Sequence, residues 1–227
     1  MLFDYGGTLV EEAQFDARAG VAALLALASH RSAHVSLDEV LERASLVTTE
    51  VADRRDQYQV ETPWASLTRL IHDYFGTRFT RPMEELELAF WKASVVTHPM
   101  PGAKHALDAL HREGLPMAVL SNSLFGSKVI RYELGKHGLA DHLAFVMVSA
   151  EYAVRKPNPL LFQTAAARFG MPASAIWCVG DRIDTDVDGA RAAGMTAVLL
   201  TATPRDRSEA ADLVVGSWME LVRCIQR

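Results

Sequence analysis

The sequence has few cysteines and no long apolar run, and both shortages exclude whole classes of protein. Its two cysteines, Cys178 and Cys224, are too few for a disulfide framework, and no Cys/His cluster has the spacing of a zinc site. The longest notable apolar run, residues 21–28, falls well short of the roughly 20 residues that a membrane-spanning helix needs. We therefore expect a cytoplasmic protein with no disulfides and no membrane partner.

Positive charge is also scarce. The chain has 23 Lys and Arg against 28 Asp and Glu, a formal net charge of −5, and no block of basic residues. This charge argues against a nucleic-acid partner. There is no secretion signal either, because Met1-Leu2-Phe3 is followed at once by Asp4, with no basic region and no apolar core.

What is present is typical of a globular chain. Hydrophobic residues make up 49% of the 227 positions, which excludes a disordered protein. The length fits one large domain or a domain with a smaller companion. Only three residues precede Asp4, so we expect either a short first strand or a natural protein that begins a few residues earlier.

Residues 14–95 are expected to be almost wholly helical. Ser36 and Glu39 form a capping box that starts one helix, and proline opens two others. No strand signal interrupts this stretch. We expect a small bundle of four helices over residues 15–30, 36–55, 62–76 and 82–91.

From about residue 99 the character changes to alternating strands and helices. Apolar runs at 116–121, 144–148, 176–179 and 196–200 are separated by helical segments. Continuous apolar strands between helices predict a parallel sheet covered on both faces. The sequence thus indicates an α/β domain of residues 1–13 and 97–227, with a helical domain of residues 14–96 inserted after the first strand.

Polar residues follow each predicted strand. Because ligands bind beyond the carboxyl ends of parallel strands, these groups should converge on one rim. Each alone has an ordinary interpretation as a turn, a helix cap or a solvated charge. Together, and in this order, they favour a site. The set is Asp4, Tyr5, Gly6, Gly7, Thr8, Ser121, Asn122, Arg155, Lys156, Asp181, Asp184 and Asp186.

The combination suits phosphoryl transfer. Asp4 and Asp181 could hold a hard cation such as Mg²⁺ through carboxylate oxygens. The metal and Lys156 would neutralise a phosphate group, while Ser121 and nearby backbone N–H groups would hold its other oxygens. A carboxylate beside the metal can also attack phosphorus and form an acyl-phosphate.

Four ordered segments resemble the motifs of the haloacid dehalogenase (HAD) superfamily of Asp-nucleophile hydrolases, over essentially the whole chain. They are residues 3–9, residues 120–122, residues 155–159, and residues 179–181 followed by Asp184 and Asp186. The resemblance implies a Rossmann-like (HAD-like) core, a helical cap inserted after the first motif, and Mg²⁺ as cofactor.

Residue roles follow from the same resemblance. Asp4 would be the nucleophile and a metal ligand, and Lys156 would stabilise charge. Asp181 and the carbonyl of Gly6 would complete the metal site, with Asp184 and Asp186 in support. The residues expected to bind the phosphate group are Gly7, Thr8, Ser121, Asn122 and Lys156.

One position departs from the family pattern. Phosphatases of the family usually carry a second aspartate two residues after the nucleophile, and here that residue is Gly6. General acid–base help is typically worth about 10²–10⁴-fold. A cap residue, a metal-bound water or the substrate could supply the proton instead.

Two functions remain open at this point. The first is an Mg²⁺-dependent phosphatase of a small phosphorylated metabolite that works through an aspartyl-phosphate. The second is a catalytically weak protein that binds phosphorylated ligands or has a regulatory role. Two other activities of the family fit less well. Dehalogenases lack the acidic fourth motif that this sequence has. Phosphonate hydrolases need a lysine in the cap, and Lys92, near the end of the cap, is the only lysine in residues 11–95.

The cap is expected to decide the substrate. Tyr5 could face it, and Arg54 and Arg55 at a helix end could hold an anionic substrate tail. The alternative for the two arginines is a solvated helix end favoured by the helix dipole. We expect a monomer or a homodimer.

Overall fold

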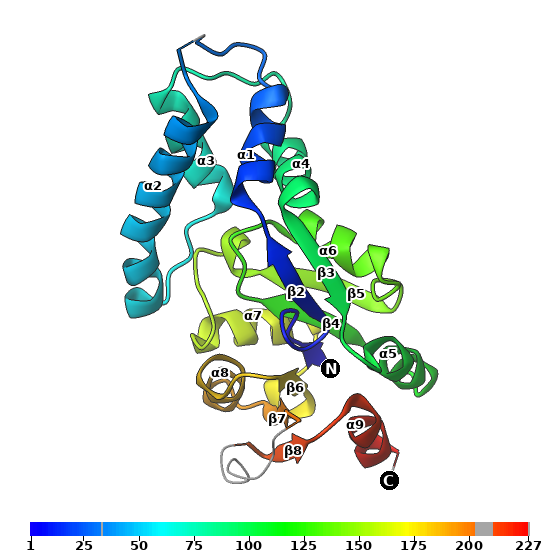
Figure 1. The fold of residues 1–227 in the computed structure, drawn as a ribbon. Helices are drawn as coiled ribbons and strands as arrows, with labels where there is room; N and C mark the ends of the chain where they lie inside the picture. Colours follow the sequence, from blue (N-terminus) through cyan, green and yellow to red (C-terminus); the bar gives the residue numbers. More distant parts are fainter. Residues whose placement is uncertain (33, 203–210, 227) are drawn as a thin grey trace.

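A computed structural model describes residues 1–32, 34–202 and 211–226. Its central element is a six-stranded sheet in which every neighbouring pair of strands is parallel. This confirms the predicted α/β class with a parallel sheet (Figure 1). In spatial order the strands are β5 (Leu143–Val148), β4 (Met117–Ser121), β1 (Leu2–Phe3), β6 (Trp177–Gly180), β7 (Thr196–Leu200) and β8 (Leu213–Val215).

Strand β1 is only two residues long, yet it occupies the middle of the sheet. Leu2 pairs with Ala118 of β4 on one side and with Cys178 of β6 on the other. The Asp4 N–H continues the ladder by donating to the Val179 carbonyl at 2.9 Å. The chain therefore delivers Asp4 to the centre of the carboxyl edge of the sheet, where open parallel sheets bind ligands.

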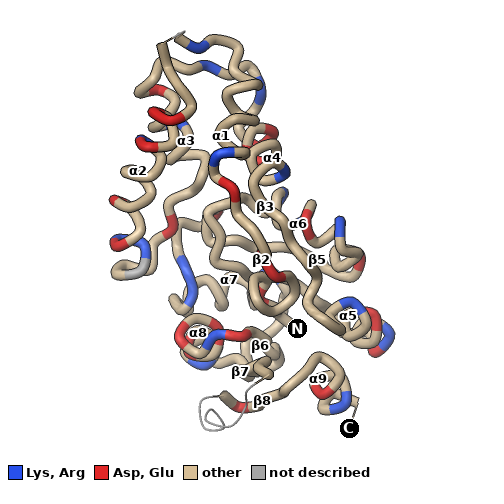
Figure 2. The backbone as a smooth tube through the Cα atoms, in the orientation of Figure 1, with Lys and Arg blue, Asp and Glu red and all other residues tan. Residues whose placement is uncertain are grey.

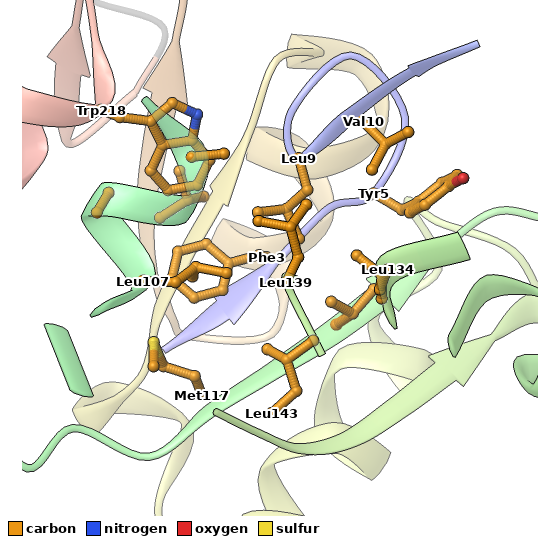
Figure 3. Packing of buried hydrophobic residues seen from close by; sticks show 14 of the residues in the cluster. Phe3, Tyr5, Leu9, Val10, Leu107, Met117, Leu134, Leu139, Leu143 and Trp218 are labelled. Atoms are coloured by element: carbon orange, nitrogen blue, oxygen red, sulfur yellow. The ribbon is translucent and has the colours of Figure 1, made fainter. Parts of the chain in front are cut away.

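Helices cover both faces of the sheet, and the two residues of β1 point to opposite faces, as strand geometry requires. Phe3 joins a core with α5 (Ala103–Arg112), α6 (Ser127–Lys136) and α9 (Trp218–Ile225). Leu2 joins a second core with α7 (Pro159–Phe169) and α8 (Asp188–Ala192). Figure 3 shows Phe3 beside Leu107 and Trp218. The ring centroids of Phe3 and Trp218 lie 5.5 Å apart.

Four further helices form a separate group at one end of the molecule (Figure 1): α1 (Ala17–Ala26), α2 (Leu37–Tyr58), α3 (Trp64–Tyr74) and α4 (Met83–Ser94). Buried apolar side chains such as Leu24, Trp64 and Phe90 give this group its own core. The predicted capping box is confirmed, because Ser36 Oγ accepts from the Glu39 N–H while the Ser36 N–H donates to Glu39 Oε2.

As expected, no strand interrupts the helices in the described residues between Ala17 and Ser94, but two strands that were not predicted flank them. Strands β2 (Val10–Phe15) and β3 (Val95–Pro99) pair as an antiparallel ribbon that leads into and out of the four helices. The first helix accordingly begins at Ala17, where Asp16 caps it. The ribbon crosses both boundaries of the predicted division into residues 1–13 and 97–227 and residues 14–96, and that division stays a prediction.

Charged residues of both signs are interspersed along the helices (Figure 2). In the part of the chain that the structure describes, no helix is both long and apolar enough to cross a bilayer.

Candidate active site

The first and fourth predicted motifs meet at the centre of the sheet. Asp4 follows β1, and Asp181 follows the neighbouring parallel strand β6. Asp186 lies on a π-helical turn, Ile183–Val187, directly after β6. One carboxylate oxygen from each of the three aspartates lies within 4.8 Å of the others. Carboxylate oxygens are the donors that Mg²⁺ prefers, so this cluster fits a hard divalent cation.

Lys156 is buried among the same carboxylates. Its Nζ donates to Asp4 Oδ1 at 2.5 Å, to Asp186 Oδ1 at 2.6 Å and to the Leu120 carbonyl at 3.1 Å. Burial disfavours the ammonium ion, but the charges of Asp186 and Asp4 outweigh that effect and raise the Lys156 pKa. Lys156 therefore stays positively charged at the bottom of the site.

The nucleophile candidate Asp4 is buried too, and burial is the main cause that raises its pKa to about 7. The neighbouring carboxylates of Asp186 and Asp181 raise it further, while Lys156 lowers it. Three carboxylates thus share one ammonium group. A bound divalent cation would supply the missing positive charge and favour the ionised form of Asp4.

Asn122 holds Lys156 in position through its backbone. The Asn122 side chain donates to the Lys156 carbonyl at 2.9 Å and accepts from the Lys156 N–H at 2.8 Å. These two bonds join the second and third motifs, which are 34 residues apart in the sequence. Ser121, the last residue of β4, is buried beside them.

Gly7 and Thr8 pack against Asp181. Gly7 has φ +75°, and a Cβ atom built on it would lie 2.6 Å from Asp181 Oδ2. Its N–H donates to the Val10 carbonyl at 2.9 Å. Thr8 is completely buried, and its hydroxyl donates to Asp181 Oδ1 at 3.2 Å. The structure thus places both residues where they support Asp181, and their expected role in phosphate binding stays a prediction.

A cavity of about 620 Å³ opens over this cluster. Arg55, in the last turn of α2, lies on its wall. Arg54 is not among the described residues of the wall; its side chain is 67% exposed and pairs with Glu50. Asp184 reaches the wall but is exposed and bound to Arg182. The predicted residues found on the wall are Asp4, Tyr5, Gly6, Ser121, Asn122, Arg155, Lys156, Asp184, Asp186 and Arg55, whereas Gly7, Thr8 and Asp181 are not among its described lining residues.

The structure adds wall residues that sequence reasoning did not single out. Glu12 lies on β2, Gln59 is the C-terminal cap of α2, and Arg182 directly follows Asp181. Arg182 could have been found from its position beside a motif aspartate. Glu12 could not, because the exposed β2 strand has no apolar alternation to mark it as a strand.

Comparison with known proteins places the chain in a family. A family model for haloacid dehalogenase-like hydrolases matches residues 1–194, so the chain belongs to that family of hydrolases. A phosphoserine phosphatase of Thermus thermophilus is 35% identical over 139 residues, which are 60% of this chain and 55% of that protein. The chain spans little more than half the length of the first curated relatives that it matches.

Solved structures with this fold include both phosphatases and dehalogenases. A HAD phosphatase from Thermococcus onnurineus has TM-score 0.65 at 23% identity, covering 99% of this chain and 96% of that one. A 2-haloacid dehalogenase from Pseudomonas syringae has TM-score 0.64 at 22% identity, covering 100% and 98%. At these sequence identities the similarity shows a shared fold only. Whether the protein acts on phosphate esters or on haloacids has to be argued from the residues of its site.

Proposed function

We propose that the protein is an Mg²⁺-dependent phosphatase acting on a small phosphorylated metabolite, with Asp4 as nucleophile. The observation that carries this proposal is the buried Lys156 ammonium bridging Asp4 and Asp186 beneath the cavity. Such a site neutralises anionic oxygens, which is what phosphoryl transfer requires. The phosphatase names of relatives such as the Thermus protein agree with this choice.

The metal would be held by Asp4 and Asp181, with the Gly6 carbonyl as the further ligand predicted from the sequence and with Asp186 as the third carboxylate of the cluster. When bound, Mg²⁺ would neutralise charge on the transferring phosphoryl group. The three carboxylates supply the oxygen donors for it, and the acidic fourth motif is the feature that separates this site from the metal-free dehalogenases.

Asp4 then does the covalent chemistry. A carboxylate oxygen of Asp4 attacks phosphorus, the bond between phosphorus and the ester oxygen breaks, and the alcohol leaves after taking a proton. Water attacks the phosphorus of the aspartyl-phosphate, releasing phosphate and restoring the Asp4 carboxylate. Lys156 keeps its proton throughout and stabilises the charge on the phosphoryl oxygens.

The leaving oxygen needs a proton donor because Gly6 has no side chain. A Cβ atom built on Gly6 meets nothing within 4 Å, so space is open beside the nucleophile. Glu12 lies on the same cavity wall, on an exposed strand, and partial loss of solvent around it raises the pKa of its carboxyl. Glu12 is our candidate for the donor.

A second function is the binding of phosphorylated ligands with little turnover. The single observation in its favour is that Gly6 provides no acid or base group beside the nucleophile. Phosphate release from a panel of phosphorylated metabolites, with Mg²⁺ and with EDTA, separates the two. The phosphatase proposal expects metal-dependent release. Stabilisation of the fold by these compounds without release would support the binding protein instead.

A further inference from the structure

We infer that Arg55 recognises a second anionic group on the substrate, so that the substrate is a phosphomonoester that also carries a carboxylate. This inference rests on the proposed phosphatase function and names the substrate class of the same site. Its basis is the position of Arg55, the way α2 is fixed to the core, and the size of the cavity.

Arg55 lines the same cavity as Asp4, Ser121 and Lys156. Of the described residues of α2 and its C-terminal cap, only Arg55 and Gln59 line the wall. They are four residues apart, which places them on the same face of the helix end. Arg54, one residue earlier, points away and is bound to Glu50 on the outer surface at 2.6 Å. The helix therefore presents one of its two adjacent arginines to the cavity.

The end of α2 is tied to the segment that carries Lys156. The Gln59 carbonyl accepts from the Arg155 N–H at 2.9 Å, and the Glu61 N–H donates to the Ala153 carbonyl at 3.2 Å. The buried Glu61 carboxylate accepts from Ser149 Oγ at 2.7 Å and from Arg155 Nη1 at 3.2 Å. We call this connection, residues 59–61 with residues 153–155, the α2 strap.

The strap connects the two segments that carry Arg55 and Lys156. Arg155 is the neighbour of Lys156 in the sequence, and Gln59 lies about one helical turn beyond Arg55. A short, hydrogen-bonded path therefore links the two residues, and both line one cavity. A substrate with negative groups at both ends matches that arrangement.

The cavity has room for such a molecule. Its volume of about 620 Å³ lies within the range of roughly 300–1,000 Å³ of small-molecule sites. Its described wall is mostly polar, with Tyr5, Gly6 and Pro157 as the exceptions. The planar fork of a guanidinium suits bidentate contact with a carboxylate or a phosphate group.

Matched substrate pairs test the inference. One pair is O-phosphoserine and O-phosphoethanolamine, and the other is 3-phosphoglycerate and glycerol 3-phosphate; in each, only the first member carries a carboxylate. We would measure kcat/KM with Mg²⁺ for the wild type, Arg55→Gln and the control Arg54→Gln. The wild type should prefer the carboxylate-bearing member, and Arg55→Gln should reduce that preference by about tenfold to a hundredfold, the usual worth of a charge-assisted hydrogen bond.

The other variants and outcomes decide the matter. Arg54→Gln should keep the wild-type preference, and Arg55→Lys, which keeps the charge without the fork, should recover part of it. An unchanged preference in Arg55→Gln would overturn the inference and leave the phosphatase proposal standing. Equal losses on both members of each pair, in the glutamine and lysine variants alike, would also overturn it. A folded wild type that releases phosphate from no ester would refute the phosphatase proposal itself, and the inference with it.

Discussion

At the scale of single residues, Gly7 shows why a motif glycine cannot be replaced. Its φ of +75° disfavours any side chain, and a Cβ atom would lie 2.6 Å from Asp181 Oδ2. Gly7→Ala should destabilise the fold by about 1–3 kcal/mol and weaken Mg²⁺ binding, because Asp181 must move. Chemical denaturation and Mg²⁺ titration measure the two effects. Gly6→Ala, with open space at its Cβ, is the matched control and should affect both much less.

Glu12 is the residue whose proposed role is most easily tested alone. If Glu12 protonates the leaving oxygen, Glu12→Gln should slow hydrolysis of alkyl phosphates about a hundredfold or more. Hydrolysis of p-nitrophenyl phosphate should fall far less, because its leaving group needs no proton. Glu11→Gln, at the neighbouring exposed position of β2, is the control. Equal losses on both kinds of ester would rule out the role as proton donor.

At the scale of elements, the α2 strap joins the end of α2 to the loop between β5 and α7 that carries Lys156. Glu61→Ala removes the carboxylate partner of Arg155 and of Ser149 inside the protein. Breaking a buried pair in this way costs about 3–5 kcal/mol, which a shift in denaturation midpoint would show. Glu50→Ala on the same helix removes an exposed pair with Arg54 and should change the midpoint far less. Similar shifts for both variants would mean that the strap contributes little.

The elements also show what a sequence can predict. The capping box fixed the start of α2 because a local pattern of two side chains satisfies backbone N–H groups there. Five of the six parallel strands were predicted, because both faces of the sheet are covered and the strand sequences are mostly apolar. The β2–β3 ribbon was not predicted, because β2 is exposed beyond Val10 and its sequence is as polar as that of a loop. No strand or helix was predicted after residue 200, where the structure has β8 and α9.

The same reasoning applies to the site. The positions of Asp4, Lys156 and Asp186 in one cluster could be predicted, because strand ends of a parallel sheet meet at one edge. The approach of Arg55 and Glu12 could not, since it depends on how α2 and the ribbon fold back over that edge. Distances between such segments are set by tertiary contacts such as the strap.

At the scale of the whole molecule, Glu87 makes stability depend on pH. It lies on α4, is 7% exposed, and accepts from the Gly126 N–H at 3.0 Å, which joins the helical group to the core. Burial is the main cause that raises its pKa to about 7. Because the folded protein holds this proton more tightly than the unfolded chain, the stabilisation is present below about pH 4.5 and is lost as pH rises through 7.

Glu87→Gln should abolish this dependence, because the amide keeps an acceptor for Gly126 and has no charge to bury. We expect the variant to exceed the wild type in stability at pH 8 by up to about 3 kcal/mol, with a smaller difference at pH 5. Denaturant unfolding of both proteins at the two pH values measures it. Glu85→Gln, on the exposed side of α4, is the control. A difference that does not change with pH would contradict the account.

The central claim is that Asp4 attacks phosphorus, and one comparison tests it most directly. Phosphate release would be followed with Mg²⁺ for the wild type and Asp4→Asn, whose amide has the same shape and is a far weaker nucleophile. We predict release by the wild type and none above background by the variant, with the free energies of unfolding of the two proteins equal within about 1–2 kcal/mol. A variant that keeps a rate near that of the wild type would contradict the mechanism.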